Sequence, residues 1–134
     1  MRHTWLWILA SALAASAQAQ GFREATAASY LDRGNSWLVK GEMERAIADF
    51  NLALEFNSRY AGAFCNRAFA RCKKGDWDAA LADFDRAIQL DPRLVQAYVG
   101  RSEIHFRKGD LDCVIRDNTK AIELNPGLAE PWLG

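Results

Sequence analysis

The sequence contains few of the residues from which covalent or catalytic sites are built. Its 134 residues include three cysteines, two histidines and three prolines. Three cysteines leave one unpaired, and no cysteines and histidines share the spacing of a zinc site. Basic and acidic side chains number 17 each, so the chain lacks the positive excess that binds nucleic-acid phosphates. We therefore expect no metal, no cofactor and no nucleic-acid partner.

Glycine is present but never in a phosphate-binding cluster, because all nine glycines occur singly. The spacing of the chain also assembles no nucleophile with a general base and an orienting group. We expect no enzymatic activity.

No hydrophobic run is long enough for a membrane span, but a short one lies at the N-terminus. Arg2 precedes an uncharged stretch from Trp5 to Ala15, and Ala17-Gln18-Ala19 places small residues where a signal peptidase cleaves. These parts indicate a secretory signal peptide over residues 1–19. The alternative is an uncleaved anchor, but the run has about 11 residues and a bilayer-spanning helix needs about 20. We expect a periplasmic or secreted protein, with no membrane span after cleavage.

The rest of the chain repeats itself every 34 residues. The triplets with this spacing are Arg33, Arg67 and Arg101; Gly41, Gly75 and Gly109; Asp49, Asp83 and Asp117; Ala53, Ala87 and Ala121. A period of about 20–50 residues is typical of a solenoid, in which each unit packs against its neighbours. After a linker at 20–26, we predict units at 27–60, 61–94 and 95–128. Residues 129–134 are predicted to be the start of a truncated fourth unit or a tail.

Each unit has the pattern of two antiparallel helices joined by a tight turn. Apolar residues recur every three or four positions on both sides of a lysine-glycine pair such as Lys74-Gly75. Glycine there favours the left-handed end of the first helix. Acidic residues such as Asp76 and Asp110 favour the start of the second, where a carboxylate accepts from free backbone amides. The predicted fold class is all-α.

The second unit carries a resemblance to a known family. The stretch from Asn66 to Pro92, which contains Lys74-Gly75-Asp76-Trp77 and Asp83-Phe84, is similar to bacterial tetratricopeptide repeats. The resemblance implies a right-handed α-solenoid whose first helices line a concave groove that binds another protein or peptide.

The third unit departs most from the family pattern. Arg71 and His105 occupy the position where the first unit has the aromatic Trp37. Asn118 occupies the position that is Phe50 and Phe84 in the earlier units. We expect the third unit to be the least regular.

The groove positions implied by the resemblance are more apolar than charged. They are Leu31, Asn35, Leu38, Cys65, Phe69, Cys72, Lys73, Val99, Glu103, Phe106 and Arg107. We interpret Phe69 and Phe106 as anchors for an extended peptide or an amphipathic helix, with the charged residues setting its orientation. The alternative is that some of these side chains pack against neighbouring helices, as apolar stripes at helical spacing often do.

The arginine and aspartate triplets lie 16 residues apart within each unit. An antiparallel hairpin would bring such residues together. We predict one charge-assisted pair per unit, which sets the register of the two helices more than it adds stability. The alternative is that both side chains are solvated. The pairs are Arg33 with Asp49, Arg67 with Asp83, and Arg101 with Asp117.

The cysteines do not form an obvious disulfide. Cys65 and Cys72 are seven residues apart on one predicted helix, so their α-carbons are about 10.5 Å apart, beyond the reach of a disulfide. Cys113 has no evident mate. We expect small, mostly buried side chains, with an intermolecular disulfide as the alternative.

The sequence indicates three candidate functions, which follow in decreasing order of support. The first is a non-enzymatic scaffold that binds a peptide or helix of a partner protein. The second is a protomer that self-associates through an uncapped C-terminal end as a homo-oligomer. The third and much weaker one is a redox or metal protein that uses Cys72, His105 and Cys113.

Overall fold

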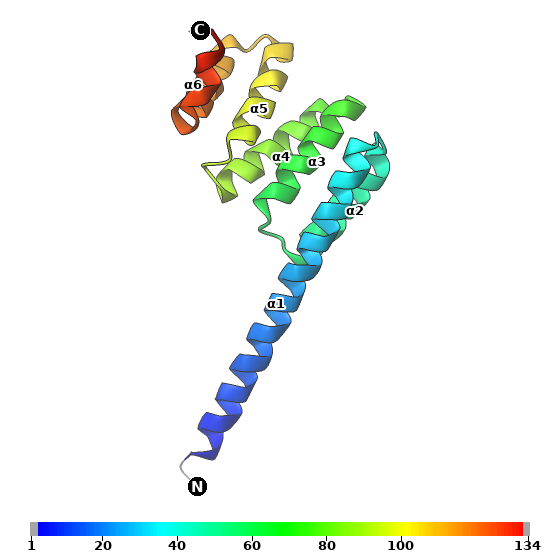
Figure 1. The fold of residues 1–134 in the computed structure, drawn as a ribbon, viewed down its shortest axis with the longest axis vertical. Helices are drawn as coiled ribbons and strands as arrows, with labels where there is room; N and C mark the ends of the chain where they lie inside the picture. The colour runs from blue at the N-terminus through cyan, green and yellow to red at the C-terminus, as the bar shows by residue number, and fades with distance from the viewer. Residues whose placement is uncertain (1–2, 133–134) are drawn as a thin grey trace.

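Helices account for all the regular elements of the structure, a computed structural model that describes residues 3–132. Within that range there is no strand, and the predicted all-α fold class is confirmed. Figure 1 shows a long first helix that projects away from an array of shorter ones. The elements are α1 (Thr4–Val39), α2 (Met43–Phe56), α3 (Ala61–Lys74), α4 (Trp77–Leu90), α5 (Val95–Lys108), α6 (Leu111–Leu124) and the 3-10 helix η1 (Pro126–Trp132).

The helices pack as three successive hairpins. The C-terminal part of α1 pairs with α2, α3 pairs with α4, and α5 pairs with α6. Each hairpin contacts the next through its second helix, and α3 also contacts both α1 and α5. In the described part of the chain, α2, α4 and α6 do not contact one another. The array is therefore closed along the first helices and splayed along the second ones, which makes the α1–α3–α5 side the concave face.

A glycine with positive φ ends the first helix of every hairpin. Gly41, Gly75 and Gly109 have φ of 80°, 83° and 77°, a conformation that strains any residue with a Cβ. A backbone bond across the turn accompanies each glycine, as expected for this helix ending. The bonds run from Glu42 N to Trp37 O (2.9 Å), from Asp76 N to Arg71 O (2.9 Å) and from Asp110 N to His105 O (3.0 Å).

The carboxylates at the start of the second helices behave differently from one another. Only Asp110 caps its helix, accepting from the backbone N–H of Cys113 at 3.2 Å. Glu42 and Asp76 make no side-chain cap. The prediction that these carboxylates accept from free amides is therefore wrong for the first two units, where the glycine turn alone sets the geometry.

Small residues let the helices approach closely around two buried rings. Phe50 and Phe84 are fully buried, with alanines such as Ala46 and Ala80 beside them. A Cβ added at Gly34 would lie 2.5 Å from the ring of Phe50, and one added at Gly100 would overlap the ring of Phe84. The cores of the first and second hairpins thus each contain an aromatic ring packed against the backbone of a neighbouring helix.

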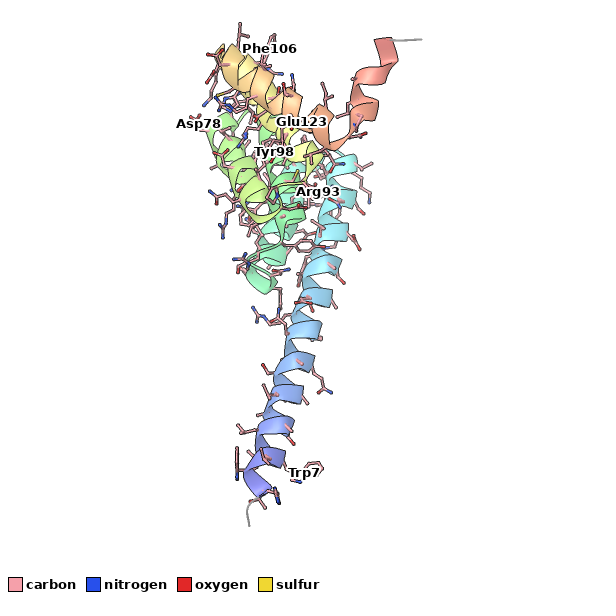
Figure 2. All side chains as sticks on the ribbon, turned by 90° about the vertical axis from the view of Figure 1, so that its left-hand side faces the viewer. Trp7, Asp78, Arg93, Tyr98, Phe106 and Glu123 are labelled. Carbon is pink, nitrogen blue, oxygen red and sulfur yellow. The ribbon has the colours of Figure 1, made fainter. Side chains whose placement is uncertain are left out.

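The N-terminal half of α1 stands outside this core. Residues 3–25 are exposed, and Figure 2 shows Trp7 near the tip of the helix, at the opposite end of the molecule from Phe106. Residues 20–26, which we predicted to be a linker, continue the same helix, because this proline-free stretch is rich in helix-forming residues. Residues 1 and 2 of the predicted signal peptide lie outside the described residues, as do residues 133 and 134 of the predicted fourth unit.

None of the helices described between residues 3 and 132 has the length and apolar character needed to cross a membrane.

Candidate functional site

The structure brings together all three arginine–aspartate pairs. In each pair the guanidinium donates two hydrogen bonds to the carboxylate, at 2.7–2.9 Å. The aspartate side chains are at most 5% exposed. The bond from Arg33 holds the pKa of Asp49 below its usual value. Each pair ties the two helices of one hairpin.

Further bonds link these pairs to the preceding hairpin. Arg67 Nη1 donates to Asn51 Oδ1 at 2.8 Å, and Arg101 Nη1 donates to Asp85 Oδ1 at 2.9 Å. Because Asn51 and Asp85 lie 34 residues apart, the repeat reproduces the same bridge. The register between successive hairpins is therefore set by polar contacts as well as by the core.

On the concave face, five of the eleven predicted groove residues surround one hollow. The hollow has a volume of about 270 Å³ and lies between α3 and α5, with the first turn of α4 at its side. Its lining residues are Phe69, Cys72, Lys73, Trp77, Glu103 and Arg107.

The walls of this hollow are held by contacts among its own residues. The guanidinium of Arg107 lies 4.5 Å from the centre of the Trp77 ring, within cation–π range. Arg107 Nη2 also donates to Glu103 Oε1 at 3.3 Å. Burial raises the pKa of the Cys72 thiol to about 11, so this side chain is neutral at physiological pH. The hollow combines an apolar floor with a charged rim.

A second, more apolar hollow of about 350 Å³ lies beside the first. The two share Phe69, and the other lining residues of the second are Val95, Gln96, Val99, Asn125 and Leu128. The Phe69 ring meets the buried Phe84 ring edge to face, with centroids 5.1 Å apart. Phe69 is thus a fixed ridge between two depressions.

The remaining predicted groove residues do not join the hollows. Cys65 is only 1% exposed and belongs to the core, so the prediction that it contacts a partner is wrong. It shares a buried cluster with Ala97 and Ile104 of α5, and burial raises the pKa of its thiol to about 12. Leu31 and Leu38 are half-buried against the first hairpin's core, and Asn35 Oδ1 accepts from Asn66 Nδ2 at 2.7 Å. Phe106 is 66% exposed but lines neither hollow.

Sequence reasoning missed Trp77, which forms part of the first hollow. Its place at the first position of α4, directly after the glycine turn, lets its ring reach the concave side. A tryptophan immediately after such a turn was the available signal.

The residues of the weakest functional alternative are only partly brought together. His105 and Cys113 lie close to each other with Asp110, whereas Cys72 lines the first hollow instead.

Comparisons with known proteins agree with this architecture. Residues 61–94 match the family model of the tetratricopeptide repeat. The family is supported by this match and by solved structures. A tetratricopeptide repeat domain of Arabidopsis OM64 superposes with a TM-score of 0.76 at 22% identity, covering 78% of this chain and 87% of that one.

Two tetratricopeptide repeat domains with a bound peptide are also similar. The second such domain of Spaghetti (RPAP3), bound to the HSP90 peptide SRMEEVD, has a TM-score of 0.77 at 29% identity and covers 81% of this chain and 99% of that chain. The first domain, bound to the same peptide, has a TM-score of 0.74 at 22% identity and covers 77% and 82%. None of the curated proteins matches the chain.

Proposed function

We propose that this chain is a non-enzymatic scaffold that binds a peptide or helix of a partner protein on its concave face. The observation that supports this proposal best is the pair of hollows that share Phe69, which together form a surface with an apolar half and a charged half. The similar Spaghetti domains, which hold an HSP90 peptide, support a binding role for this fold.

The two halves of the surface fit different parts of one ligand. The hollow around Val99 suits an apolar side chain, because Val95, Phe69 and Leu128 remove it from water. Lys73 on the rim of the other hollow suits a carboxylate. An extended peptide, or a helix with one apolar and one acidic side, would place both groups at once.

Point variants on this surface test the proposal. Peptides selected from a random library on the immobilised protein are measured by fluorescence anisotropy. We expect Val99→Lys and Lys73→Glu each to weaken binding at least tenfold. Val99→Lys places a charge in the apolar hollow, and Lys73→Glu reverses the charge at the edge of the other hollow. Arg86→Glu makes the same charge change on an exposed position of α4 and should bind as the wild type does. Peptides that bind all variants equally would contradict the proposal.

Self-association is a second candidate, favoured by an apolar stripe on α6. Leu111, Ile115 and Ile122 are exposed, Ile115 by 64%, and their spacing places them on one face of the helix. The corresponding residues of α4, which include Trp77, Leu81 and Ile88, pack against the core that α4 shares with α3 and α5. The α6 stripe therefore has the character of an interface.

Sedimentation velocity separates the two candidates. If the α6 stripe joins copies, the wild type should sediment as a dimer or larger species at micromolar concentration, and Ile115→Lys should sediment as a monomer. A monomeric wild type that binds selected peptides would leave only the scaffold function.

We also propose that residues 1–19 direct export and that the mature protein is periplasmic or secreted. The charge of Arg2, the short apolar run and the small residues at Ala17 and Ala19 support this. N-terminal sequencing of the expressed protein should find Gln20 first, and Ala19→Asp should retain the full-length N-terminus. A wild-type protein that keeps its N-terminal segment after export would contradict cleavage.

A further inference from the structure

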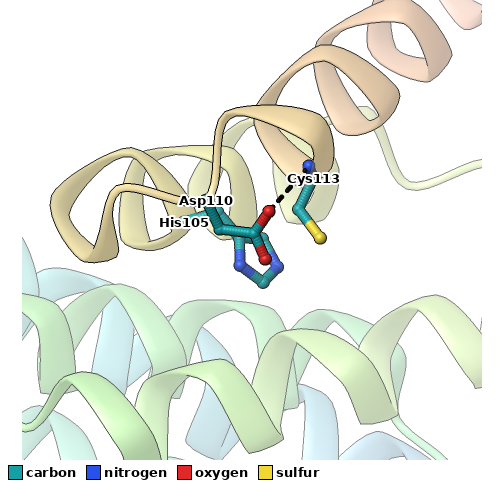
Figure 3. A group of neighbouring side chains, drawn as sticks. All are labelled: His105, Asp110 and Cys113. Atoms are coloured by element: carbon teal, nitrogen blue, oxygen red, sulfur yellow. Dashed lines mark hydrogen bonds between the residues drawn. The ribbon is translucent and has the colours of Figure 1, made fainter.

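Three different metal-ligating side chains converge at the turn between α5 and α6. His105 lies in the last turn of α5, Asp110 is the N-cap of α6, and Cys113 lies in the first turn of α6. Their ligand atoms all lie within 4.8 Å of one another. Figure 3 shows the imidazole, the carboxylate and the thiol turned toward a common point. None of the three lines either hollow of the concave face.

We propose that His105, Asp110 and Cys113 bind a zinc ion, with water as the fourth ligand. Zinc in proteins is tetrahedral and takes histidine nitrogen and carboxylate oxygen at about 2.0–2.2 Å and cysteine sulfur at about 2.3 Å. Donor atoms at two corners of such a tetrahedron lie about 3.5 Å apart. Closing from the present separations needs side-chain movements on the order of 1 Å, which rotation about side-chain bonds supplies at a surface turn.

The donor set favours zinc over the hard cations. A thiolate and an imidazole are the ligands that zinc and similar transition ions prefer, whereas Mg²⁺ and Ca²⁺ take oxygen ligands. The thiolate and the carboxylate together carry two negative charges, which balance one Zn²⁺ when the imidazole is neutral. On binding, the Cys113 proton leaves to solvent.

The backbone of the turn holds the three residues in position. Asp110 N donates to His105 O at 3.0 Å, and Asp110 Oδ1 accepts from Cys113 N at 3.2 Å. This backbone bond to one carboxylate oxygen positions the Asp110 side chain at the start of α6. Arg116 Nη1 lies 3.9 Å from Cys113 Sγ. The positive charge of Arg116 opposes the binding of a cation. The guanidinium also donates a hydrogen bond to Cys113 Sγ, as groups around a metal site do when they stabilise a thiolate ligand.

The other two turns act as internal controls, because they share the glycine conformation and a carboxylate but have neither the histidine nor the cysteine. The residues at the corresponding positions are Trp37, Glu42 and Arg45 in the first hairpin, and Arg71, Asp76 and Ala79 in the second. The repeat architecture therefore does not require a histidine or a cysteine at these positions. Their presence together in the third turn is particular to that turn.

Cobalt titration of the metal-free full-length chain tests the site. Co²⁺ reports a thiolate ligand through sulfur-to-metal charge-transfer absorption, and Zn²⁺ should displace it. We expect one ion per chain, complete loss of the absorption in Cys113→Ser, and at least tenfold weaker binding in His105→Gln and Asp110→Asn. Asp110→Asn keeps a side chain able to cap α6. Cys72→Ser removes a thiol outside the cluster and should bind as the wild type does.

Circular dichroism of each variant distinguishes a loss of metal binding from a loss of folding. If Cys113→Ser unfolds, the weaker cobalt binding expected of Asp110→Asn tests the site instead. Zinc should also raise the melting temperature of the wild type and not of Asp110→Asn, since an ion bound only by the folded state stabilises it. Absence of the charge-transfer band in the wild type, or a band that survives in Cys113→Ser, would overturn the proposal.

Discussion

The second and third hairpins share one backbone design but use it differently. In the second, Phe84 is fully buried, and Asp83 is bound by both Arg67 and Arg71. In the third, the exposed Asn118 occupies the position that corresponds to Phe84. There Asp117 accepts two hydrogen bonds from Arg101. The family model recognises the second hairpin, at residues 61–94.

This difference concerns which hairpin can carry ligating side chains in place of residues that stabilise the fold. The position of Arg71 serves packing and charge pairing in the second hairpin, so its identity is constrained by Asp83. In the third hairpin the same position is His105, whose imidazole lies near Asp110 and Cys113. The hairpin whose second helix buries fewer side chains thus carries the histidine, the aspartate and the cysteine of the proposed zinc site.

The largest expected contrast is between Phe84→Ala and Asn118→Ala. Removing the Phe84 ring leaves a cavity against the backbone of Gly100 and the Phe69 ring, which should lower the free energy of unfolding by about 3–5 kcal/mol. The same change at the exposed Asn118 should stay within about 0.5 kcal/mol. Urea unfolding followed by circular dichroism measures both. Similar losses in the two variants would show that the hairpins are packed alike.

A smaller contrast comes from exchanging Arg71 and His105. Arg71 Nη1 donates to Asp83 Oδ2 at 2.7 Å, so Arg71→His should cost about 1 kcal/mol by removing a charge-assisted bond. His105→Arg offers Asp117 the corresponding bond and should stabilise by a similar or smaller amount. Both are measured by urea unfolding with a chelator present, so that no metal contributes. A loss of stability in both variants would mean that the third hairpin cannot accept the pairing of the second.

Much of this fold could be predicted from the sequence because its determinants are local or periodic. The 34-residue spacing, the glycine turns and the apolar stripes predicted two helices in each of three units, and the structure has these six helices within the described residues. The 16-residue spacing of Arg67 and Asp83 named two side chains that the structure places 2.7 Å apart. Each of these inferences needed only the geometry of one hairpin.

The parts that could not be predicted depend on how separate elements meet. The family resemblance implied that Cys65 lies in the groove, but its side chain belongs to a buried cluster shared with Ala97 and Ile104 of the neighbouring hairpin. Trp77 reaches the concave hollow only because the glycine turn directs the start of α4 that way. The sequence spacing of His105, Asp110 and Cys113 matches no recognised metal-binding motif. The left-handed turn at Gly109 brings these three side chains together. Contacts across turns and between hairpins are not readable from the period of one helix.

The smallest expected effect concerns the first hairpin, where the pairing of Arg33 with Asp49 lowers the pKa of the Asp49 carboxyl. A carboxyl with a lowered folded-state pKa stabilises the fold above its unfolded value of about 3.9. That contribution is lost as the pH falls through the lower, folded value. Because the Arg33 side chain is 59% exposed, solvent weakens the pair.

As the pH falls from neutral to values below the folded-state pKa of Asp49, we therefore expect the wild type to lose its stability advantage over Asp49→Asn, with the loss beginning near the unfolded value of about 3.9. The difference in urea midpoint should be on the order of 0.3 M at neutral pH and should shrink toward zero at the acid end. A difference between wild type and Asp49→Asn that stays constant over this range would mean that the Asp49 carboxylate acts through shape and hydrogen bonding, and not through its charge.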